Sequence, residues 1–390
     1  MYKVDWPQRG HHYDENIIQE ISNLLKSGKP LTQNEYVKKF ENDFSNYLNV
    51  QNSFAVMSCA HALDITALLL ELEAGDEIII PTHTYCATAI AFARKGIKIV
   101  WADIDNKTWT VNKEIIKKLI TPKTKAVVVV HLYGLMCPDM NDIYDVCKKS
   151  NIFLVEDCAQ SLGAQQNNKQ CGTFGDFACF SFHAQKNITT LGEGGMLVVK
   201  NKSIAEKVLG LRLNGHKKFN NQIEYWLPAM TNVDEDLRNE WPIKSTMTEV
   251  QAIVGSYYIK KLDEMTSLRR ARGIYARELF KKYSSVVEFQ EIYEDSAHSH
   301  HLLPIKIKCK KTNRDKIIKL LSEKYGVKAI IQYRPLHSYD LFVKKGFGGG
   351  EFIESEELFN NMVSIPFSLT MTDDEFKYVL ECTRETIINA

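Results

Sequence analysis

Short apolar runs alternate with helical patterns between residues 34 and 200, and this alternation limits the folds open to the chain more than any other feature. Residues 127–130 are four consecutive valines, as is common in strands that are covered on both faces. Apolar residues at helical spacing lie between such runs, for example Val37, Phe40, Phe44 and Leu48. The pattern predicts an α/β fold built around a sheet with helices packed on it.

The same patterns divide the chain into two predicted domains. Strands are predicted at residues 53–57, 77–81, 97–102, 126–131, 152–156, 177–182 and 196–199. Residues 214–244 are polar and aromatic without clear periodicity, which favours a long functional loop. A long amphipathic helix is predicted at about 248–283, and a smaller α+β unit follows, with strands at 302–307 and 327–331 and helices at 314–325 and 373–388. We therefore predict a large domain at residues 1–255 and a small C-terminal domain at residues 256–390.

Composition excludes several classes of protein. The 390 residues carry 49 Lys and Arg against 48 Asp and Glu, and the net charge of +1 provides no basic surface for nucleic acid. No run reaches the ~18 apolar residues of a membrane span, and residues 1–9 lack the apolar core of a signal peptide. The nine cysteines are scattered and show no Cys-x-x-Cys spacing. They favour a reducing cytoplasm over a disulfide framework or a structural zinc site, and we expect no bound metal.

Two pairs of adjacent histidines, His11-His12 and His300-His301, are candidate metal ligands. Neighbouring residues on a strand point to opposite faces, so neither pair chelates well by itself. We expect both pairs to lie at the surface or at the edge of a substrate site.

A lysine and an acid are the best candidates for chemistry. Lys186 lies in a predicted loop between two strands, close to Gly-Glu-Gly-Gly at residues 192–195, whose glycines allow a backbone to approach a ligand. Asp157 follows a predicted buried strand, where the ligand crevices of α/β sheets open. Together they suit pyridoxal phosphate (PLP), because the lysine can form a Schiff base and the acid can pair with the pyridine nitrogen. From spacing alone, a solvated lysine and a helix-capping aspartate are the more common interpretation.

Eight ordered segments point to a family. They read KKFE (38–41), GDEIIIP (75–81), VVHLYG (129–134), VEDCAQ (155–160), SFxxxK (181–186), GEGG (192–195), MTEVQA (247–252) and RPLH (334–337). In this order, and over nearly the whole chain, the sequence resembles the DegT/DnrJ/EryC1/StrS family of PLP-dependent enzymes that aminate keto sugars. The resemblance implies the type I fold of PLP-dependent transferases, as in aspartate aminotransferase, with a large mixed-sheet α/β domain and a small C-terminal α+β domain.

The resemblance also implies roles for individual residues. Lys186 would form the Schiff base with PLP and, once released by substrate, move the proton between the sugar carbon and the cofactor. Asp157 would pair with the pyridine nitrogen, Gln160 would lie near the ring hydroxyl, and Ser181 would donate to the phosphate. Tyr85 stands where the family places an aromatic ring against the pyridine, and an ordinary core aromatic is the alternative. No role is assigned to His183.

The segment expected to bind the phosphate departs from the family pattern. The family reads Ser-Gly-Thr-Ala-Ala-Leu, whereas residues 58–63 read Ser-Cys-Ala-His-Ala-Leu, so Cys59 and Ala60 replace the glycine and the hydroxyl-bearing residue. Backbone amides at the start of the following helix can still hold an anion. One side-chain donor is lost, a charge-assisted hydrogen bond worth about 1.5–3 kcal/mol, and the sequence leaves open whether His61 replaces it.

A second departure precedes residues 247–252. The family usually has an Asn there that reaches the phosphate of the neighbouring subunit, followed by an Arg; this chain has Lys244 and Thr246. Lys244 can serve a phosphate as a point charge and so compensate for the altered segment. The alternatives are that it binds a phosphate or carboxylate of the substrate, or that it is an exposed loop lysine.

The resemblance thus predicts a cytoplasmic PLP-dependent aminotransferase, a homodimer with the active site at its interface and Lys244 contributed to the partner. L-Glutamate is the expected amino donor and a nucleotide-linked keto-deoxy sugar the acceptor, in surface polysaccharide or other glycan synthesis. Lys186 favours transamination over the dehydrating family variant, which has His at this position. The alternatives are an aminotransferase for a small phosphorylated ketone, motivated by residues 58–63, and a regulatory PLP-binding protein without turnover. Tyr333 and His337 are candidate substrate contacts.

Overall fold

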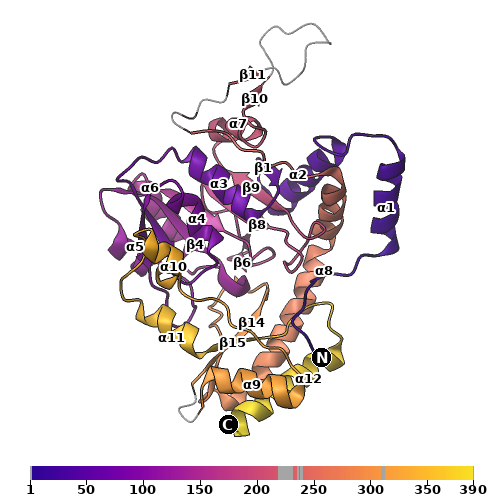
Figure 1. Cartoon of the computed structure of the whole chain (residues 1–390), viewed down its shortest axis with the longest axis vertical. Coiled ribbons are helices and arrows are strands. Elements are labelled where there is room, and N and C mark those ends of the chain that lie inside the picture. Colours follow the sequence, from indigo (N-terminus) through magenta and orange to yellow (C-terminus); the bar gives the residue numbers. More distant parts are fainter. Residues whose placement is uncertain (1, 218–231, 235–236, 238–239, 309–311, 390) are drawn as a thin grey trace.

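A seven-stranded mixed sheet forms the centre of the computed structural model, which describes all residues except 1, 218–231, 235–236, 238–239, 309–311 and 390 (Figure 1). The strand order is β1 (Ser53–Val56), β9 (Gly195–Val199), β8 (Phe177–Ser181), β5 (Phe153–Asp157), β4 (Thr124–Val130), β2 (Glu77–Pro81) and β3 (Lys98–Ala102). Strand β9 runs antiparallel to both of its neighbours, and the other strands share one direction. Their carboxyl ends therefore lie along one edge, where ligand sites of α/β sheets form.

Helices cover both faces of the sheet, as the valine run predicts. Val127 and Val129 of β4 belong to one core cluster, whereas Val128 and Val130 belong to the other. The first cluster includes residues of α2 (Glu35–Leu48), α5 (Lys113–Leu119), α6 (Met140–Lys149) and the first half of α8 (Glu249–Phe280). The second includes residues of α3 (Cys59–Leu69), α4 (Ala87–Ala93) and α7 (Lys202–Leu211). Because successive side chains of a strand alternate between faces, one valine run anchors both helix layers.

The long helix α8 joins this sheet to a second core. It begins at a capping box formed by Thr248 and Gln251. Leu262 packs into the core of the large sheet, and Phe280 packs into the second core. That second core includes residues of β12 (Val287–Glu288), β14 (Leu303–Ile307), β15 (Met362–Ile365), α9 (Arg314–Tyr325) and α12 (Asp373–Asn389). We propose that the division between the two domains falls within α8.

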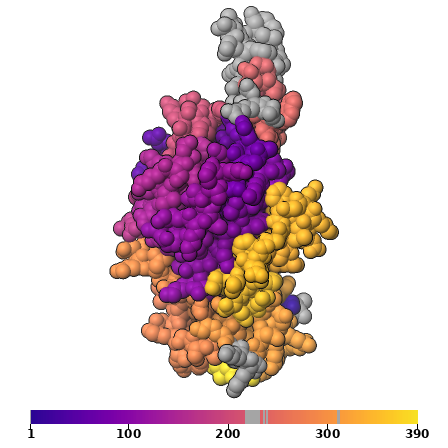
Figure 2. Space-filling model, turned by 90° about the vertical axis from the view of Figure 1, so that its left-hand side faces the viewer, coloured from indigo at the N-terminus to yellow at the C-terminus, as the bar shows by residue number. Residues whose placement is uncertain are grey.

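Two segments cross this division. Val4 pairs with Val327 and lies in the core of the small unit, although it precedes the large sheet in the sequence. In the other direction, Phe342 of α10 (Asp340–Lys344) and Leu358 of α11 (Ile353–Asn361) belong to a core cluster of the large sheet. In Figure 1, α10 and α11 lie beside the purple part of the molecule, and Figure 2 shows a yellow-orange surface in contact with the purple one. The order of the chain therefore does not separate the two cores.

Most predicted elements are present, with ends shifted by a few residues, but the strand predicted at residues 327–331 is wrong. This segment forms only single bridges, from Val327 to Val4 and from Ile330 to Ser364. Ile330 and Ile331 pack against the large core, whereas Val327 and Ala329 pack into the small one, so the segment is shared between the two cores and pairs with β15 only at Ile330. The sequence analysis also missed the helices α1 (Glu15–Lys26), α7, α10 and α11.

Much of the loop predicted at residues 214–244 lies outside the described residues. Within the described part of the chain, no helix has the length and apolar character that crossing a membrane requires.

Candidate active site

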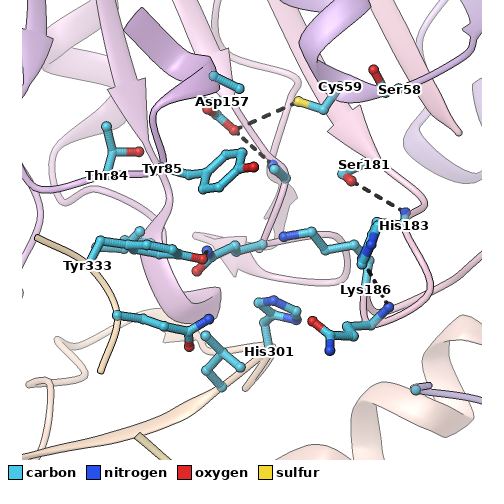
Figure 3. Close-up of a pocket in the computed structure, with 18 of the residues that line it drawn as sticks. Ser58, Cys59, Thr84, Tyr85, Asp157, Ser181, His183, Lys186, His301 and Tyr333 are labelled. Atoms are coloured by element: carbon cyan, nitrogen blue, oxygen red, sulfur yellow. Dashed lines mark hydrogen bonds between the residues drawn. The ribbon is translucent and has the colours of Figure 1, made fainter. Parts of the chain in front are cut away.

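A pocket of about 430 Å³ opens at the carboxyl edge of the large sheet. Residues at the ends of four strands line it: Ser58 after β1, Tyr85 after β2, Asp157 at the end of β5 and Ser181 at the end of β8. Lys186 enters from the loop after β8, and its side chain extends across the pocket (Figure 3). The pocket is completed by residues from distant segments, among them Arg9, Arg269, His301, Tyr333 and Ser368.

Asp157 is buried and has few hydrogen-bond donors. Its Oδ2 accepts from Thr88 Oγ1 at 2.8 Å and its Oδ1 from the Ala159 N–H at 3.0 Å, while Cys59 Sγ lies 4.0 Å from Oδ1. Burial raises the pKa of Asp157 above its ordinary value, although these bonds and Lys186 act in the opposite direction. A carboxylate in this position is stabilised by a nearby cation, and the protonated nitrogen of a pyridine ring supplies one.

Lys186 is half-buried, and its amine lacks a partner. No hydrogen bond or ion pair of its Nζ is found in the part of the chain that the structure describes (Figure 3). Burial lowers the pKa of Lys186, which favours the neutral, nucleophilic amine. The N-terminal segment fixes the backbone of this loop, because His11 Nε2 lies 2.8 Å from the Lys186 carbonyl and the Gly10 N–H donates to the Ala184 carbonyl at 2.8 Å.

Two further side chains face the same space. Tyr85 is 57% exposed, so it is not a core aromatic, and its ring centroid lies 5.9 Å from that of Tyr333. Gln160 is fixed at both ends of its amide: Oε1 accepts from the Tyr133 N–H at 2.7 Å, and Nε2 donates to Tyr333 Oη at 2.9 Å. An unpaired amine, an acid in need of a cation and an accessible aromatic ring together fit PLP.

The start of α3 and Ser181 form the part of the pocket that suits a phosphate. Cys59 and Ala60 both line the pocket and contribute the first-turn amides of α3, where the partial charge of a helix is positive. Ser58 Oγ caps α3 by accepting from the His61 N–H at 3.2 Å, and it lies 2.9 Å from His61 Nδ1. His61 thus contacts Ser58 and is not among the residues that line the pocket. The Ser181 hydroxyl accepts from the His183 N–H at 3.4 Å, which leaves its own proton free to be donated.

Two of the glycines at residues 192–195, Gly194 and Gly195, lie where a side chain would clash with neighbouring residues. A Cβ on Gly195 would lie 2.4 Å from the carbonyl carbon of Ser58, and one on Gly194 would lie 1.9 Å from Thr190 Oγ1. Gly192 has a φ of 125°, a conformation that favours glycine. Gly195 therefore lets β9 pass against Ser58 and Cys59 at the start of α3.

Lys244 does not line the pocket of its own chain. It is exposed, and its backbone pairs with Leu213. A contact between Lys244 and the phosphate of a partner subunit stays a prediction.

The expectation for the histidine pairs is only partly right. His11, His300 and His301 are buried: His11 Nε2 contacts the Lys186 carbonyl, and the carbonyls of His300 and His301 accept from Arg269 of α8. His301 lines the pocket, but His300 and His12 do not. Of the two candidate substrate contacts, Tyr333 lines the pocket.

His337 does not line it. It is buried, with Nδ1 2.8 Å from Thr82 Oγ1 and Nε2 3.1 Å from Glu356 Oε1, so its role is structural. The sequence analysis missed Thr84, Arg9, Arg269 and Ser368, which also line the pocket. Thr84 lies next to Tyr85 and could have been found, but the others come from segments without a motif.

Behind the pocket, Glu156 is part of a buried hydrogen-bond network. His131 Nε2 lies 2.9 Å from Glu156, and His131 Nδ1 accepts from the Cys137 N–H, so Nε2 carries the proton. Glu156 also accepts from three backbone N–H groups, those of Gly172, Phe174 and Gly175. These bonds hold the pKa of Glu156 below its ordinary value, although burial alone would raise it. His131, Glu156 and Cys158 lie close enough together to be considered as metal ligands. The side-chain atoms of His131 and Glu156, however, are already hydrogen bonded within the protein.

Known proteins resemble this chain over nearly its whole length. Residues 11–384 match the model of the DegT/DnrJ/EryC1/StrS aminotransferase family. The chain belongs to this family. It is 30% identical to dTDP-3-amino-3,6-dideoxy-alpha-D-galactopyranose transaminase of Aneurinibacillus thermoaerophilus, over 97% of each chain. It is 29% identical to GDP-perosamine synthase of Escherichia coli O157:H7, over 94% of each chain.

The fold also matches that of a Streptococcus pneumoniae protein solved in its PLP form, with a TM-score of 0.86, 24% identity and 98% of each chain covered. The protein is a PLP-dependent aminotransferase of the type I fold, and its relatives include transaminases of nucleotide-linked sugars. The predictions of family, fold class, enzyme class and cofactor are therefore confirmed.

Proposed function

We propose that this aminotransferase moves the amino group of L-glutamate to a nucleotide-linked keto-deoxy sugar, for surface polysaccharide or other glycan synthesis. The observation that carries the proposal is the unpaired amine of the half-buried Lys186, whose pKa is lowered, in one pocket with the buried carboxyl of Asp157, whose pKa is raised. The named sugar relatives support the acceptor class. Because one of them is named for dTDP and the other for GDP, the nucleotide stays unspecified.

Each pocket residue has a part in this proposal. PLP, when bound, supplies an electron-withdrawing ring that stabilises negative charge on the carbon that loses a proton. Lys186 is the residue that would hold the cofactor and, when a substrate amine displaces it, accept and return that proton at Nζ. Asp157 would keep a positive charge on the ring nitrogen, and Tyr85 would cover one face of the ring and exclude water. Gln160 would orient the ring at its hydroxyl.

The phosphate would be held by Ser181 and by the first-turn amides of α3, at Cys59 and Ala60. The altered residues 58–63 therefore leave a binding surface made mainly of backbone. Lys244 of a partner subunit would add the missing charge.

We further propose a homodimer whose interface closes the pocket. Three large apolar side chains near the proposed interface are exposed: Met57 and Tyr85 at the pocket side of the sheet, and Trp241 close to Lys244 in the sequence. Trp241 is 83% exposed, which is unusual for a tryptophan without a partner. The cysteines of the described residues are free, which supports a cytoplasmic enzyme.

The proposal is tested by incubating the enzyme with PLP, L-glutamate and two classes of acceptor, nucleotide-linked keto sugars and small phosphorylated ketones. We expect glutamate to remove the visible absorption of the lysine-bound cofactor with release of 2-oxoglutarate, and keto sugars to restore it. A Lys186→Ala variant is the control and should show neither change. Turnover of small phosphorylated ketones alone would refute the sugar acceptor and favour the alternative that residues 58–63 suggest.

A further inference from the structure

Arg269 of α8 is a buried arginine in the wall of the pocket. It is 2% exposed and lines the same space as Lys186. Its Nη1 donates to the carbonyl of His300 at 3.2 Å and to that of His301 at 3.5 Å, while its buried Nε has no hydrogen-bond partner. No carboxylate in the described part of the chain forms an ion pair with it. A buried charge without an opposite charge is costly, so this side chain is built for a ligand or for a structural need.

The neighbouring Arg270 is an example of an arginine with a structural role. Its Nε donates to the His298 carbonyl at 3.0 Å and its Nη2 to the Gly163 carbonyl at 2.9 Å. Arg270 is half-buried and does not line the pocket. Arg269 differs in each respect, because it is deeper, faces the pocket and has donor capacity left over.

The surroundings of Arg269 favour an anion. Burial lowers the pKa of Arg269 to about 10, which leaves it charged at neutral pH. His301 beside it is buried, and its Nδ1 has no hydrogen-bond partner. Burial holds the pKa of His301 well below its ordinary value, and the charges of Lys186 and Arg269 add to this effect. Lys186 and Arg269 therefore both lie near His301. The carboxylates that line the pocket are Asp157, which the cofactor would engage, and the exposed Glu193.

Two anions enter such a pocket in the proposed reaction, the carboxylate of the amino donor and the diphosphate of the sugar nucleotide. The α-carboxylate of an amino acid is attached to the carbon that reacts, so it must lie close to Lys186. A diphosphate is separated from the reacting carbon by part of the sugar ring and reaches farther out. In Figure 3, His301 lies beside the Lys186 side chain, on the side away from Asp157. An anion site at this place suits the carboxylate, and a guanidinium binds a carboxylate through two parallel hydrogen bonds.

We propose that Arg269 binds a carboxylate of the amino donor and thereby restricts the donor to amino acids. The inference rests on the proposed transamination and names the residue that recognises its first substrate. Arg9, exposed at the same pocket, adds attraction for a second carboxylate, as in a dicarboxylic amino acid.

The test measures binding of glutarate, a dicarboxylate that has no amine and cannot react, to the PLP-loaded protein by calorimetry. Arg269→Lys keeps the charge but loses the paired hydrogen bonds, and we expect it to weaken glutarate binding about tenfold or more. Arg270→Lys is the matched control on the same helix, and it should bind glutarate as the wild type does. Thermal unfolding of both variants establishes that each is folded, and Arg269→Gln provides a second variant if Arg269→Lys does not fold.

A second readout separates recognition from a general structural effect. In Arg269→Lys the KM for L-glutamate should rise, while the rate with an amine that carries no carboxylate should stay the same. Absence of glutarate binding to the wild type, equal binding by Arg269→Lys, or an equal loss in Arg270→Lys would each overturn the inference. So would loss of GDP or dTDP binding with glutarate binding intact, because it would assign Arg269 to the nucleotide. If no keto sugar accepts the amino group, the proposed function fails, yet the glutarate measurement still decides the role of Arg269.

Discussion

Glu156 and Asp157 are neighbours at the end of β5, and they show how the two sides of one sheet use the same chemical group differently. Both side chains are buried. Behind the sheet, Glu156 is hydrogen bonded to His131 and to three backbone N–H groups, and its pKa is lowered. In front, Asp157 has fewer donors, and burial raises its pKa. A buried acid that the protein supplies with enough hydrogen-bond donors stabilises the fold. A buried acid with too few donors is available to bind a ligand.

The largest effect is expected on the front side, at Lys186. Lys186→Ala removes both the residue that holds the cofactor and the proposed proton carrier, so the rate of 2-oxoglutarate release should fall by about 10⁴-fold or more. The free energy of unfolding should not decrease, because the amine that is lost is half-buried and unpaired. Lys200→Ala, an exposed lysine that does not line the pocket, is the control and should leave the rate unchanged. A Lys186→Ala enzyme that still turns over at a rate near the wild type would assign the chemistry to another group.

On the rear side the expected effect is on stability. Glu156→Ala leaves His131 and three backbone N–H groups without their acceptor, and the free energy of unfolding should fall by about 3–5 kcal/mol. Urea unfolding of the cofactor-free protein measures this change, with Glu156→Gln as the variant that retains the shape. Since the pKa of Glu156 is lower in the folded state, its contribution is present above the ordinary pKa of 4.5 and is lost as the pH falls through the folded value. A change below about 1 kcal/mol would show that water replaces the carboxylate.

Asp157→Asn should lower activity without lowering stability, the opposite of the effect expected for Glu156→Ala. Activity should fall about 100-fold, because the ring nitrogen loses its charged partner, as on truncation of a buried charge pair. The cofactor-free variant should be at least as stable as the wild type. The pKa of Asp157 is higher in the folded state, so the wild type loses stability as the pH rises above the ordinary value of 3.8, and the amide removes this loss. Thermal unfolding across pH measures the effect, and a variant that is both active and less stable would contradict the contrast between the two acids.

The same contrast explains how much of the site could be predicted from sequence. Asp157, Ser181 and Lys186 lie in short motifs at strand ends, and the order of strands in an α/β sheet brings such ends to one edge. Arg269 and Arg270 are adjacent and identical in type, so no spacing distinguishes the one that lines the pocket. Only the packing of α8 against residues 298–301 determines which of the two arginines faces the pocket.

Packing also decided the strand that was predicted wrongly. Residues 327–331 have a strand-like pattern, but Val327 and Ala329 pack into the small core while Ile330 and Ile331 pack on the large one, and these tertiary contacts outweigh local β preference. The cofactor side of the pocket was therefore predictable, because it depends on the sheet. On the side that would select the substrate, Tyr333 and His301 were predicted, but Arg9, Arg269 and Ser368 were not, because that side depends on contacts between distant segments.

The smallest effect is expected at Tyr85, because its uncharged ring would add only contact area with PLP. Tyr85→Leu should weaken PLP binding by the value of an aromatic contact, about 0.5–1.5 kcal/mol, whereas Tyr85→Phe retains the ring and should bind as the wild type does. Tyr275, an exposed tyrosine of α8 that does not line the pocket, provides the control Tyr275→Leu. Equilibrium titration of the cofactor-free variants measures the change. If Tyr85→Leu binds PLP as tightly as the wild type, then Asp157, Lys186 and the phosphate contacts hold the cofactor without it, and the exposed ring serves the partner subunit instead.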